Sequence, residues 1–410
     1  TSCGLSYGLL LDYRFESRGL LNIAVPISLL DGAALLAAAS AVSAAAAGVR
    51  RKPLPPYLII PLLVYAASIA LGIAMAFFNS NPLYAMFKDI RVQVYFLLAL
   101  FITSAYAASA DELRFLIVVI ILAAVSVGVQ QIVHVLTIDP GMALFQVRDV
   151  RIPVQMLPIA TSFLIPLWVS RRRRRDWWFL PPAQALFLCA VLLSFTRSVW
   201  AQFALGIAMV LLFLSLRQRM VVVKALVISL PLVIFVTPIL GRSIAYRQSL
   251  GALLAERVVS FAQGEEDASQ AARLLEGQAA LLKWLANPIL GSGLGTEIES
   301  FDPVQGKMVR GEFLHNSLLY YAIKLGLPGL IGLIWIYAAS VGTAVKTRSV
   351  PSLSCYAAGT VCALIPFALI GIWSGNLNHV AFSPLLGFLV GINWTALAAG
   401  STPARSAEEG

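Results

Sequence analysis

The sequence predicts an all-α polytopic membrane protein with about 11–12 transmembrane helices. Of its 410 residues, 59% are hydrophobic and only 12% are charged, whereas soluble domains carry roughly 25% charged residues. The mean hydropathy is +0.83. A soluble fold could not hide so much apolar surface, so lipid must be the solvent for most of it. This composition excludes a disordered chain, a secreted disulfide scaffold and a coiled coil.

Long apolar runs give the individual helices, because a membrane-spanning helix needs roughly 20 mainly apolar residues. Eight runs come first, at Ile23–Gly48, Tyr57–Phe78, Val92–Ala110, Leu113–Leu136, Ile152–Val169, Trp177–Phe195, Ser198–Leu216 and Val221–Leu240. Three more close the chain, at Pro328–Val345, Ser354–Trp373 and His379–Ala399. Since the chain starts at Thr1 without a Met, we expect upstream sequence, and a helix in that sequence would make twelve.

Basic residues orient these helices, because Lys and Arg are enriched in cytoplasmic connections. They gather in every second connection, most densely at Arg171–Arg175. That run favours a membrane anchor near anionic headgroups over a nucleic-acid site. The long polar stretch between the eighth and ninth runs then lies outside. We therefore expect an N-terminal transmembrane bundle (1–240), a large helical outer loop subdomain (241–313), which the family resemblance described below places in the periplasm, and C-terminal transmembrane helices with a short cytoplasmic tail (314–410).

The cysteines and histidines predict no metal site. Neither a C-x-x-C pattern nor clustered histidines are present among Cys3, Cys189, Cys355, Cys362, His134, His315 and His379. Metal ligands normally come at short, regular spacings. We expect neither a metal nor another cofactor.

Within the outer loop, Ser269 has the position of an N-cap for a helix that runs to about Ala286. Its apolar side is supplied by Leu274, Leu275, Leu281, Leu282 and Leu285. The segment Gly291–Gly295 follows, with glycine at every second position. Alternating glycines allow a tight turn, and their exposed N–H groups could also meet an anion. A dinucleotide-binding interpretation is poor, because no βαβ unit surrounds them.

After the loop, His315 opens a short half-helix that ends near Leu325, and Gly326–Gly329 breaks it before the span itself begins. Broken helices at membrane depth are tolerated where they line protein or a water-filled cavity. We therefore expect a cavity beside His315.

Several arginines point to an anionic substrate. Arg197 interrupts the apolar stretch Trp177–Leu216, where an ionisable residue is costly and faces a cavity or snorkels to the interface. The loop adds Arg242, Arg247, Arg257 and Arg273. Guanidinium groups match phosphate geometry. The alternative is a surface ion pair, such as Arg273 with Glu276. Trp200, Tyr320 and Tyr321 fit either stacking on sugars or an interfacial belt.

These features occur in one order: Thr196-Arg197-Ser198, the long loop, Asn287-Pro288-Ile289-Leu290 with the three glycines, His315-Asn316 and Gly326-Leu327-Pro328-Gly329. Together they resemble the O-antigen ligase and polymerase superfamily of bacterial envelope enzymes. The stretches 256–260 and 267–269 resemble that family's loop as well. The resemblance covers about residues 194–334.

The resemblance implies a metal-independent membrane glycosyltransferase in the bacterial inner (cytoplasmic) membrane, with its active site facing the periplasm. Its donor would be a glycan on undecaprenyl diphosphate. Its acceptor would be lipid A-core in a ligase, or a second lipid-linked glycan in a polymerase. Membrane lipids are the remaining partners, and no nucleic acid is expected.

The resemblance also implies the roles of individual residues. Arg197 and Arg273 would bind the diphosphate and stabilise the charge that builds on it, and Arg257 is a less close match. His315 would act as the base, with Asn316 as a substrate-binding neighbour. The chemistry agrees, because histidine is the side chain that ordinarily exchanges a proton near neutral pH. The acidic run Glu265–Asp267 would oppose a diphosphate unless arginines pair with it. A transporter of the same lipid-linked glycan is the rival class.

Overall fold

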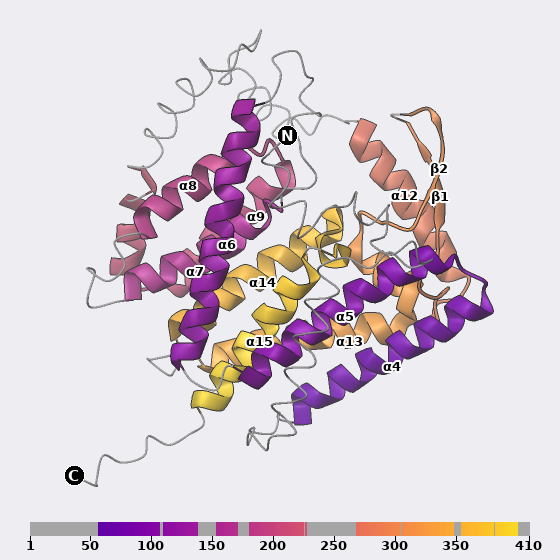
Figure 1. The fold of residues 1–410 in the computed structure, drawn as a ribbon, viewed down its shortest axis with the longest axis horizontal. Coiled ribbons are helices and arrows are strands. Elements are labelled where there is room, and N and C mark those ends of the chain that lie inside the picture. The colour runs from indigo at the N-terminus through magenta and orange to yellow at the C-terminus, as the bar shows by residue number, and fades with distance from the viewer. Residues whose placement is uncertain are drawn as a thin grey trace, which may run out of the picture. The chain divides into compact units, whose positions relative to one another are not determined.

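The computed structural model describes residues 56–106, 110–137, 153–170, 180–224, 226–227, 268–303, 305–347, 354–380 and 382–400. Figure 1 shows that most of these residues are helical. Several expectations lie outside the described residues: the runs Ile23–Gly48 and most of Val221–Leu240, the basic run Arg171–Arg175, the acidic run Glu265–Asp267, and Arg242, Arg247 and Arg257. The chain forms two compact units: the first combines 1–109, 266–343 and 371–410, and the second 110–265 and 344–370.

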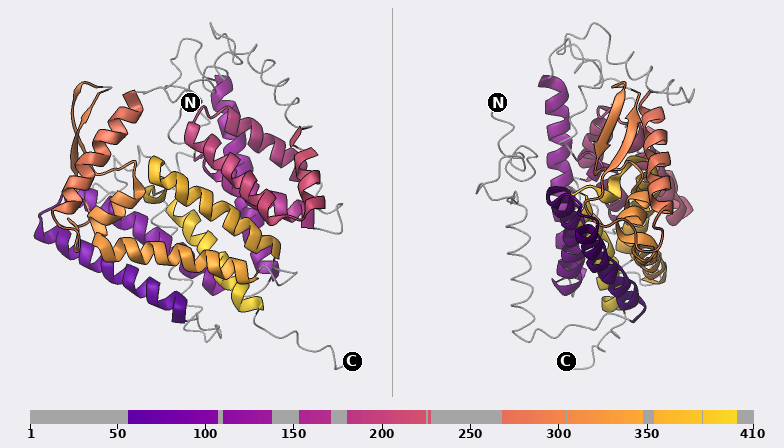
Figure 2. Two further views of the ribbon diagram at one scale, coloured as in Figure 1. Left: turned by 180° about the vertical axis from the view of Figure 1, so that it is seen from behind. Right: turned by 90° about the vertical axis from the view of Figure 1, so that its right-hand side faces the viewer.

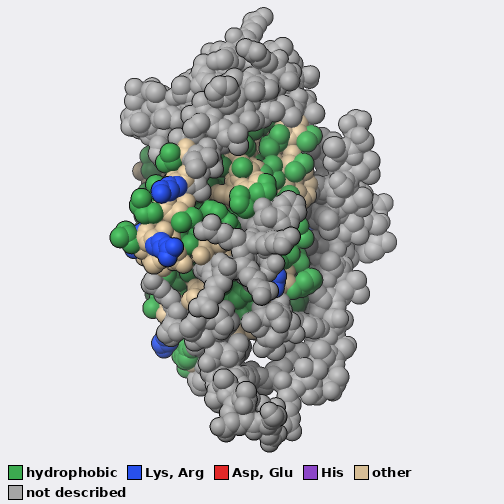
Figure 3. Space-filling view, turned by 90° about the vertical axis from the view of Figure 1, so that its left-hand side faces the viewer, with side chains coloured by type: hydrophobic (Ala, Val, Ile, Leu, Met, Phe, Trp, Pro, Cys, Tyr) green, Lys and Arg blue, Asp and Glu red, His purple; other side chains and the backbone are tan. Residues whose placement is uncertain are grey.

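The predicted apolar runs that fall in the described residues are helices. They are α4 (Pro56–Phe78), α5 (Leu83–Tyr106), α6 (Ala110–Thr137), α7 (Met156–Ser170), α8 (Leu180–Leu192), α9 (Arg197–Phe213), α13 (Ser317–Thr347), α14 (Ser354–Ser374) and α15 (Ser383–Gly400). In this part of the chain, four helices are long and apolar enough to cross a membrane, namely α4, α6, α13 and α14. On the face drawn in Figure 3, the described side chains are mainly hydrophobic. The mostly helical membrane class is therefore confirmed, while the total of 11–12 spans stays a prediction.

Helix α5 begins at Leu83 rather than at the predicted Val92. Asp89 and Arg91 thus lie inside a helix, where both are buried, and not in a connection between spans. The prediction was wrong because hydropathy treats every charge as exposed, whereas Asp89 has partners within the protein. Helix α15 packs closely along α5 in the first unit, and a Cβ atom at Gly387 would lie 2.2 Å from the carbonyl oxygen of Phe96. Small residues at such contacts let membrane helices approach each other.

The loop contains a β-hairpin as well as a helix, so the expectation of a helical loop in an all-α fold needs correction. Helix α12 (Ala268–Leu285) is followed by the antiparallel strands β1 (Ile298–Asp302) and β2 (Lys307–Gly311), which lie beside it in Figure 2. The strands pair in register from Ile298 with Gly311 to Asp302 with Lys307, and Gly306 supplies the positive φ of 63° in the turn. Apolar and polar residues do not alternate strictly along either strand, so the sequence carries no clear strand signal.

Helix α13 is broken where the sequence predicts. Gly326 has φ 68° and ψ −176° within the helix, which separates a half-helix from the long span. Only glycine fits here, because a Cβ atom would lie 2.0 Å from the carbonyl oxygen of Ile289. The break therefore joins α13 to the segment that follows α12.

In the second unit, α7, α9 and α14 meet in a small apolar core, and α6 and α8 pack beside α7. That core contains Ile165, Val210, Leu214, Val222 and Cys362. The Ser162 hydroxyl also donates a hydrogen bond to the carbonyl of Cys362 at 3.1 Å. These contacts hold α7 and α9 against α14.

Candidate functional site

The three alternating glycines form a packed junction. Gly291, Gly293 and Gly295 have φ angles of 71°, 86° and 76°, which favour glycine. The turn binds α4 through the N–H of Leu294, which donates to the carbonyl of Gly72 at 3.0 Å. The N–H of Gly295 donates to Asp89 Oδ2 at 2.6 Å. The anion that the last glycine meets is therefore the protein's own carboxylate.

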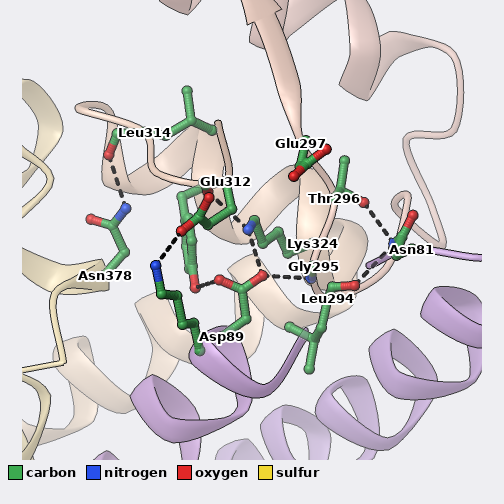
Figure 4. Close-up of polar contacts among 12 residues, drawn as sticks. Asn81, Asp89, Leu294, Gly295, Thr296, Glu297, Glu312, Leu314, Lys324 and Asn378 are labelled. Atoms are coloured by element: carbon green, nitrogen blue, oxygen red, sulfur yellow. Dashed lines mark hydrogen bonds and ion pairs between the residues drawn. The ribbon is translucent and has the colours of Figure 1, made fainter. Parts of the chain in front are cut away.

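Asp89 lies at the centre of a buried polar cluster (Figure 4). Besides Gly295, it accepts hydrogen bonds from the Tyr320 hydroxyl at 2.6 Å and from the Lys324 ammonium. Lys324 is fully buried and Asp89 is 3% exposed. A buried charge is tolerated only when it is paired and hydrogen-bonded, as it is here. The cluster thus ties α5, the glycine turn and the half-helix of α13 together.

Glu312, at the end of the hairpin, connects this cluster to the segment that carries His315. Its carboxylate pairs with Lys88 at 2.8 Å, and its carbonyl accepts a hydrogen bond from Lys324 at 2.9 Å. Burial alone would raise the pKa of Glu312, but the Lys88 hydrogen bond and the charges of Lys88 and Lys324 outweigh it and lower the pKa. Glu312 is therefore held as a carboxylate.

The other side of this segment is fixed by the connection between α14 and α15. Asn378 donates to the carbonyl of Leu314 at 2.9 Å and accepts from the Ser317 hydroxyl at 3.1 Å (Figure 4 draws the first of these bonds). Ser317 in turn accepts the backbone N–H of Leu377 at 3.2 Å. Since both flanks are anchored, the residues between Glu312 and Ser317 are held in one conformation.

His315 lies in this fixed segment and is paired with Glu276 of α12. Its Nδ1 atom lies 2.9 Å from Glu276 Oε2, and its backbone N–H donates to the same oxygen at 3.1 Å. The ring of Phe313 packs edge-on against the imidazole, with centroids 5.3 Å apart. The His315 side chain is 41% exposed. When Nδ1 donates to the carboxylate, Nε2 carries the lone pair that can accept a proton.

The neighbouring residues with predicted roles lie on the same unit. Asn316 caps the half-helix, because its side-chain oxygen accepts the N–H of Leu319 at 3.0 Å. Arg273 precedes Glu276 by one helical turn on α12, and its Nη1 donates to the carbonyl of Trp373 at 3.4 Å. The structure thus brings Arg273, Glu276, His315 and Asn316 into one unit.

Arg197 belongs to the second unit, so its position relative to His315 stays a prediction. It is the first residue of α9 and follows the N-cap residue Thr196. The turn before it is rigid, because Gln131 donates to the carbonyl of Leu193 at 3.0 Å. The Trp200 indole donates across the same turn to Val191 at 2.8 Å. Arg197 is half-buried, and helix N-termini favour anions, so this position suits a phosphate contact.

Two of the predicted roles for aromatic residues were wrong. Tyr320 and Tyr321 are buried, and their hydroxyls donate to Asp89 and to the carbonyl of Leu377. Neither ring is accessible for stacking on a sugar or for an interfacial belt. Their hydroxyls satisfy buried polar groups, which sequence spacing does not reveal.

Two residues of this site were missed from the sequence. Asp89 had a usable signal, because it is a carboxylate at the edge of a long apolar run, and such residues are expected to have partners. Glu276 had none, because it lies on a helix with ordinary polar spacing. Among the described residues, no group of three or more His, Cys, Asp or Glu side chains could hold a metal ion.

Comparison with known proteins identifies the domain that carries these residues. Residues 182–334 match the family model described as O-antigen ligase. The match includes Arg197, Arg273 and His315, and it covers less than half of the 410-residue chain. No curated protein matches the chain. The part of the chain that carries Arg197, Arg273 and His315 is therefore similar to the O-antigen ligase family.

Proposed function

We propose that this protein transfers a glycan from undecaprenyl diphosphate to an acceptor hydroxyl at the periplasmic face of the bacterial inner membrane. The match to the O-antigen ligase family and the candidate membrane spans support a membrane glycosyltransferase in general. The observation that carries the specific proposal is the histidine–glutamate pair of His315 and Glu276. A ring nitrogen available to accept a proton is what activation of an acceptor hydroxyl requires.

In this mechanism, His315 Nε2 takes the proton of the acceptor hydroxyl as its oxygen attacks the anomeric carbon of the donor sugar. The bond between that carbon and the diphosphate oxygen breaks, and the diphosphate leaves with the electron pair. Glu276 holds the ring by accepting from Nδ1. The carboxylate also stabilises the imidazolium that forms when Nε2 accepts the proton.

The arginines supply the second part of the mechanism. Negative charge builds on the leaving diphosphate, and fixed donors aimed at that charge contribute about 3–4 kcal/mol each. We assign this role to Arg197 and Arg273, with Arg257 and Asn316 as further substrate contacts. Arg273 lies on the same helix as Glu276, so α12 would present both the diphosphate contact and the histidine's partner. No metal or other cofactor enters this mechanism.

The acceptor decides between two related activities. Lipid A-core as the acceptor makes the protein a ligase, and a second lipid-linked repeat unit makes it an O-antigen or exopolysaccharide polymerase. Both use the same donor site. A transporter of lipid-linked glycans is a weaker alternative, because it gives no reason for a histidine held by a carboxylate beside the membrane.

The test is transfer by the purified full-length protein in detergent, with undecaprenyl-diphosphate-linked glycan as the donor. Reactions with and without lipid A-core, and with EDTA, run beside Arg197→Ala and His315→Ala. Product that needs lipid A-core identifies a ligase, and longer carrier-linked chains without it identify a polymerase. Arg310→Ala is the control, because this exposed loop arginine pairs with Glu297 at 2.6 Å. Absence of product from several donors would reject the proposal in favour of transport.

A further inference from the structure

Helix α12 carries its leucines on the side that faces away from the protein. The exposed fraction is 63% for Leu274, 70% for Leu282 and 56% for Leu285, and Leu275 and Leu281 are exposed beside them. These five residues, the leucine face, share one side of the helix because they recur at helical spacing. An amphipathic helix in water would bury such a face against its own protein.

The opposite side of α12 is polar, and it contacts the rest of the first unit. Glu276 accepts hydrogen bonds from the histidine of the site, and Lys283 donates to the carbonyl of Glu297 at 2.6 Å. Ala280, on the same side, is fully buried. The helix therefore turns Glu276 and Ala280 inward and its leucine face outward, while Lys283 stays exposed at the edge. That inversion is expected only where the outer surroundings are apolar.

The leucine face continues into the exposed surface of a membrane-spanning helix. After α12 the chain exposes Ile289 and Leu290, and Gly293 of the glycine turn then packs against Ala76 in the last turn of α4. That end of α4 exposes Phe77 and Phe78, the latter by 81%. In Figure 1, α12 runs across the direction of α4. A helix that crosses the end of a span lies along the membrane surface.

We infer that the leucine face of α12 is embedded in phospholipid at the membrane–water interface. The occupant is the acyl-chain layer of the bilayer, because the face is continuous with the apolar surface of α4. Apolar burial at the interface is what holds such a helix in the membrane plane. Membrane binding of the leucine face would then keep α12 in contact with the segment of His315, because Glu276 lies on the side of α12 that faces this segment. This inference does not depend on the glycosyltransferase activity.

Nitroxide accessibility tests this inference on the full-length protein in nanodiscs of phosphatidylethanolamine and phosphatidylglycerol. A spin label is placed at Leu282→Cys and, as the matched control, at Gln305→Cys in the exposed turn of the hairpin. Labelled wild type gives the background from the native cysteines. We expect the ratio of collisions with oxygen to collisions with a water-soluble nickel chelate to be several-fold higher at position 282 than at position 305.

Two results would overturn the inference. Free access of the nickel chelate to position 282 would mean that the leucine face lies in water. Low access of both reagents would mean that protein covers it, for example a second copy of this chain. If Leu282→Cys does not fold, Leu274→Cys on the same face provides the same measurement.

Discussion

A single carboxylate oxygen, Oε2 of Glu276, contacts both the imidazole and the backbone N–H of His315, at 2.9 and 3.1 Å. The glutamate therefore fixes the main chain of the histidine as well as the rotation of its ring. Because Nδ1 is engaged, proton transfer is left to Nε2. This relationship separates the roles of the two residues: His315 would contact the substrate, whereas Glu276 positions the histidine.

Substitutions of Glu276 should reveal this positioning role. Glu276→Gln keeps an oxygen acceptor but loses the charge, and charged and neutral hydrogen bonds differ by about 1 kcal/mol, so transfer should fall about fivefold. Glu276→Ala loses both the oxygen acceptor and the negative charge, and it should slow transfer by about 100-fold. The measurement is the transfer rate at saturating donor, with donor binding determined separately. Wild-type rates for both variants would mean that the contact has no role in catalysis, provided that both unfold at the wild-type temperature.

The buried pair of Asp89 and Lys324 predicts strongly non-additive changes in stability. Lys324→Met leaves the Asp89 carboxylate buried without its cation, which should cost about 3–5 kcal/mol. Adding Asp89→Asn removes the uncompensated charge, so the double variant should be more stable than Lys324→Met. Thermal unfolding in detergent, monitored by size-exclusion chromatography, gives the order of stability of the single and double variants. Simple additivity of the two single changes would contradict the central place of this pair.

Two glycines of the loop should respond to alanine in opposite directions. Gly293 has φ 86°, and a Cβ atom there would lie 2.4 Å from the backbone nitrogen of Ala76. The left-handed conformation alone costs a non-glycine residue about 1–2 kcal/mol, and the backbone contact adds to it. Gly277 lies within α12, and a Cβ atom there meets nothing within 4 Å, so alanine should stabilise by about 0.5–1 kcal/mol. Unfolding temperatures of Gly293→Ala and Gly277→Ala test this contrast.

The ion pair of Lys88 and Glu312 should make stability depend on acid pH. Since the pKa of Glu312 is lowered in the folded protein, the pair stabilises above the ordinary glutamate pKa of 4.5. This contribution, about 1 kcal/mol or less, is lost as the pH falls through the lowered value. Wild type should therefore be more stable than Lys88→Met at neutral pH, and the difference should vanish in acid. A difference that persists below the lowered pKa would assign the effect to packing of the lysine stem.

The sequence predicts much of the fold, because apolar runs and glycine breaks act locally. The runs gave the helices that the structure describes, and Gly326–Gly329 gave the break in α13. Long-range pairing was harder to predict. The contact between Asp89 and Lys324 joins residues far apart in the chain, and hydropathy placed Asp89 outside its helix. The β-hairpin was missed because apolar and polar residues do not alternate strictly along its two strands.

The residues of the candidate site also fall into those that the sequence predicts and those that only the structure shows. His315 and Arg273 stand out in the sequence through the order of motifs, and both lie in the first unit. Glu276 does not stand out, because a glutamate on an amphipathic helix has many possible roles. Its role becomes visible only when α12 is placed beside the histidine. Asn316 shows the same limit, since the structure adds a helix-capping role that accompanies the predicted substrate contact.

Arg273 provides the sharpest test of the diphosphate contact. Its guanidinium presents several donors in a rigid fork, which lysine cannot reproduce. Arg273→Ala should lower transfer by about 100- to 1,000-fold, as for other fixed donors that stabilise a leaving charge. Arg273→Lys keeps the positive charge and should restore only part of this loss. The matched control Arg310→Ala changes an arginine of the same loop that is 69% exposed, and it should stay near the wild-type rate. If Arg273→Lys equals wild type, charge alone suffices, and bidentate recognition of the diphosphate by this residue is wrong.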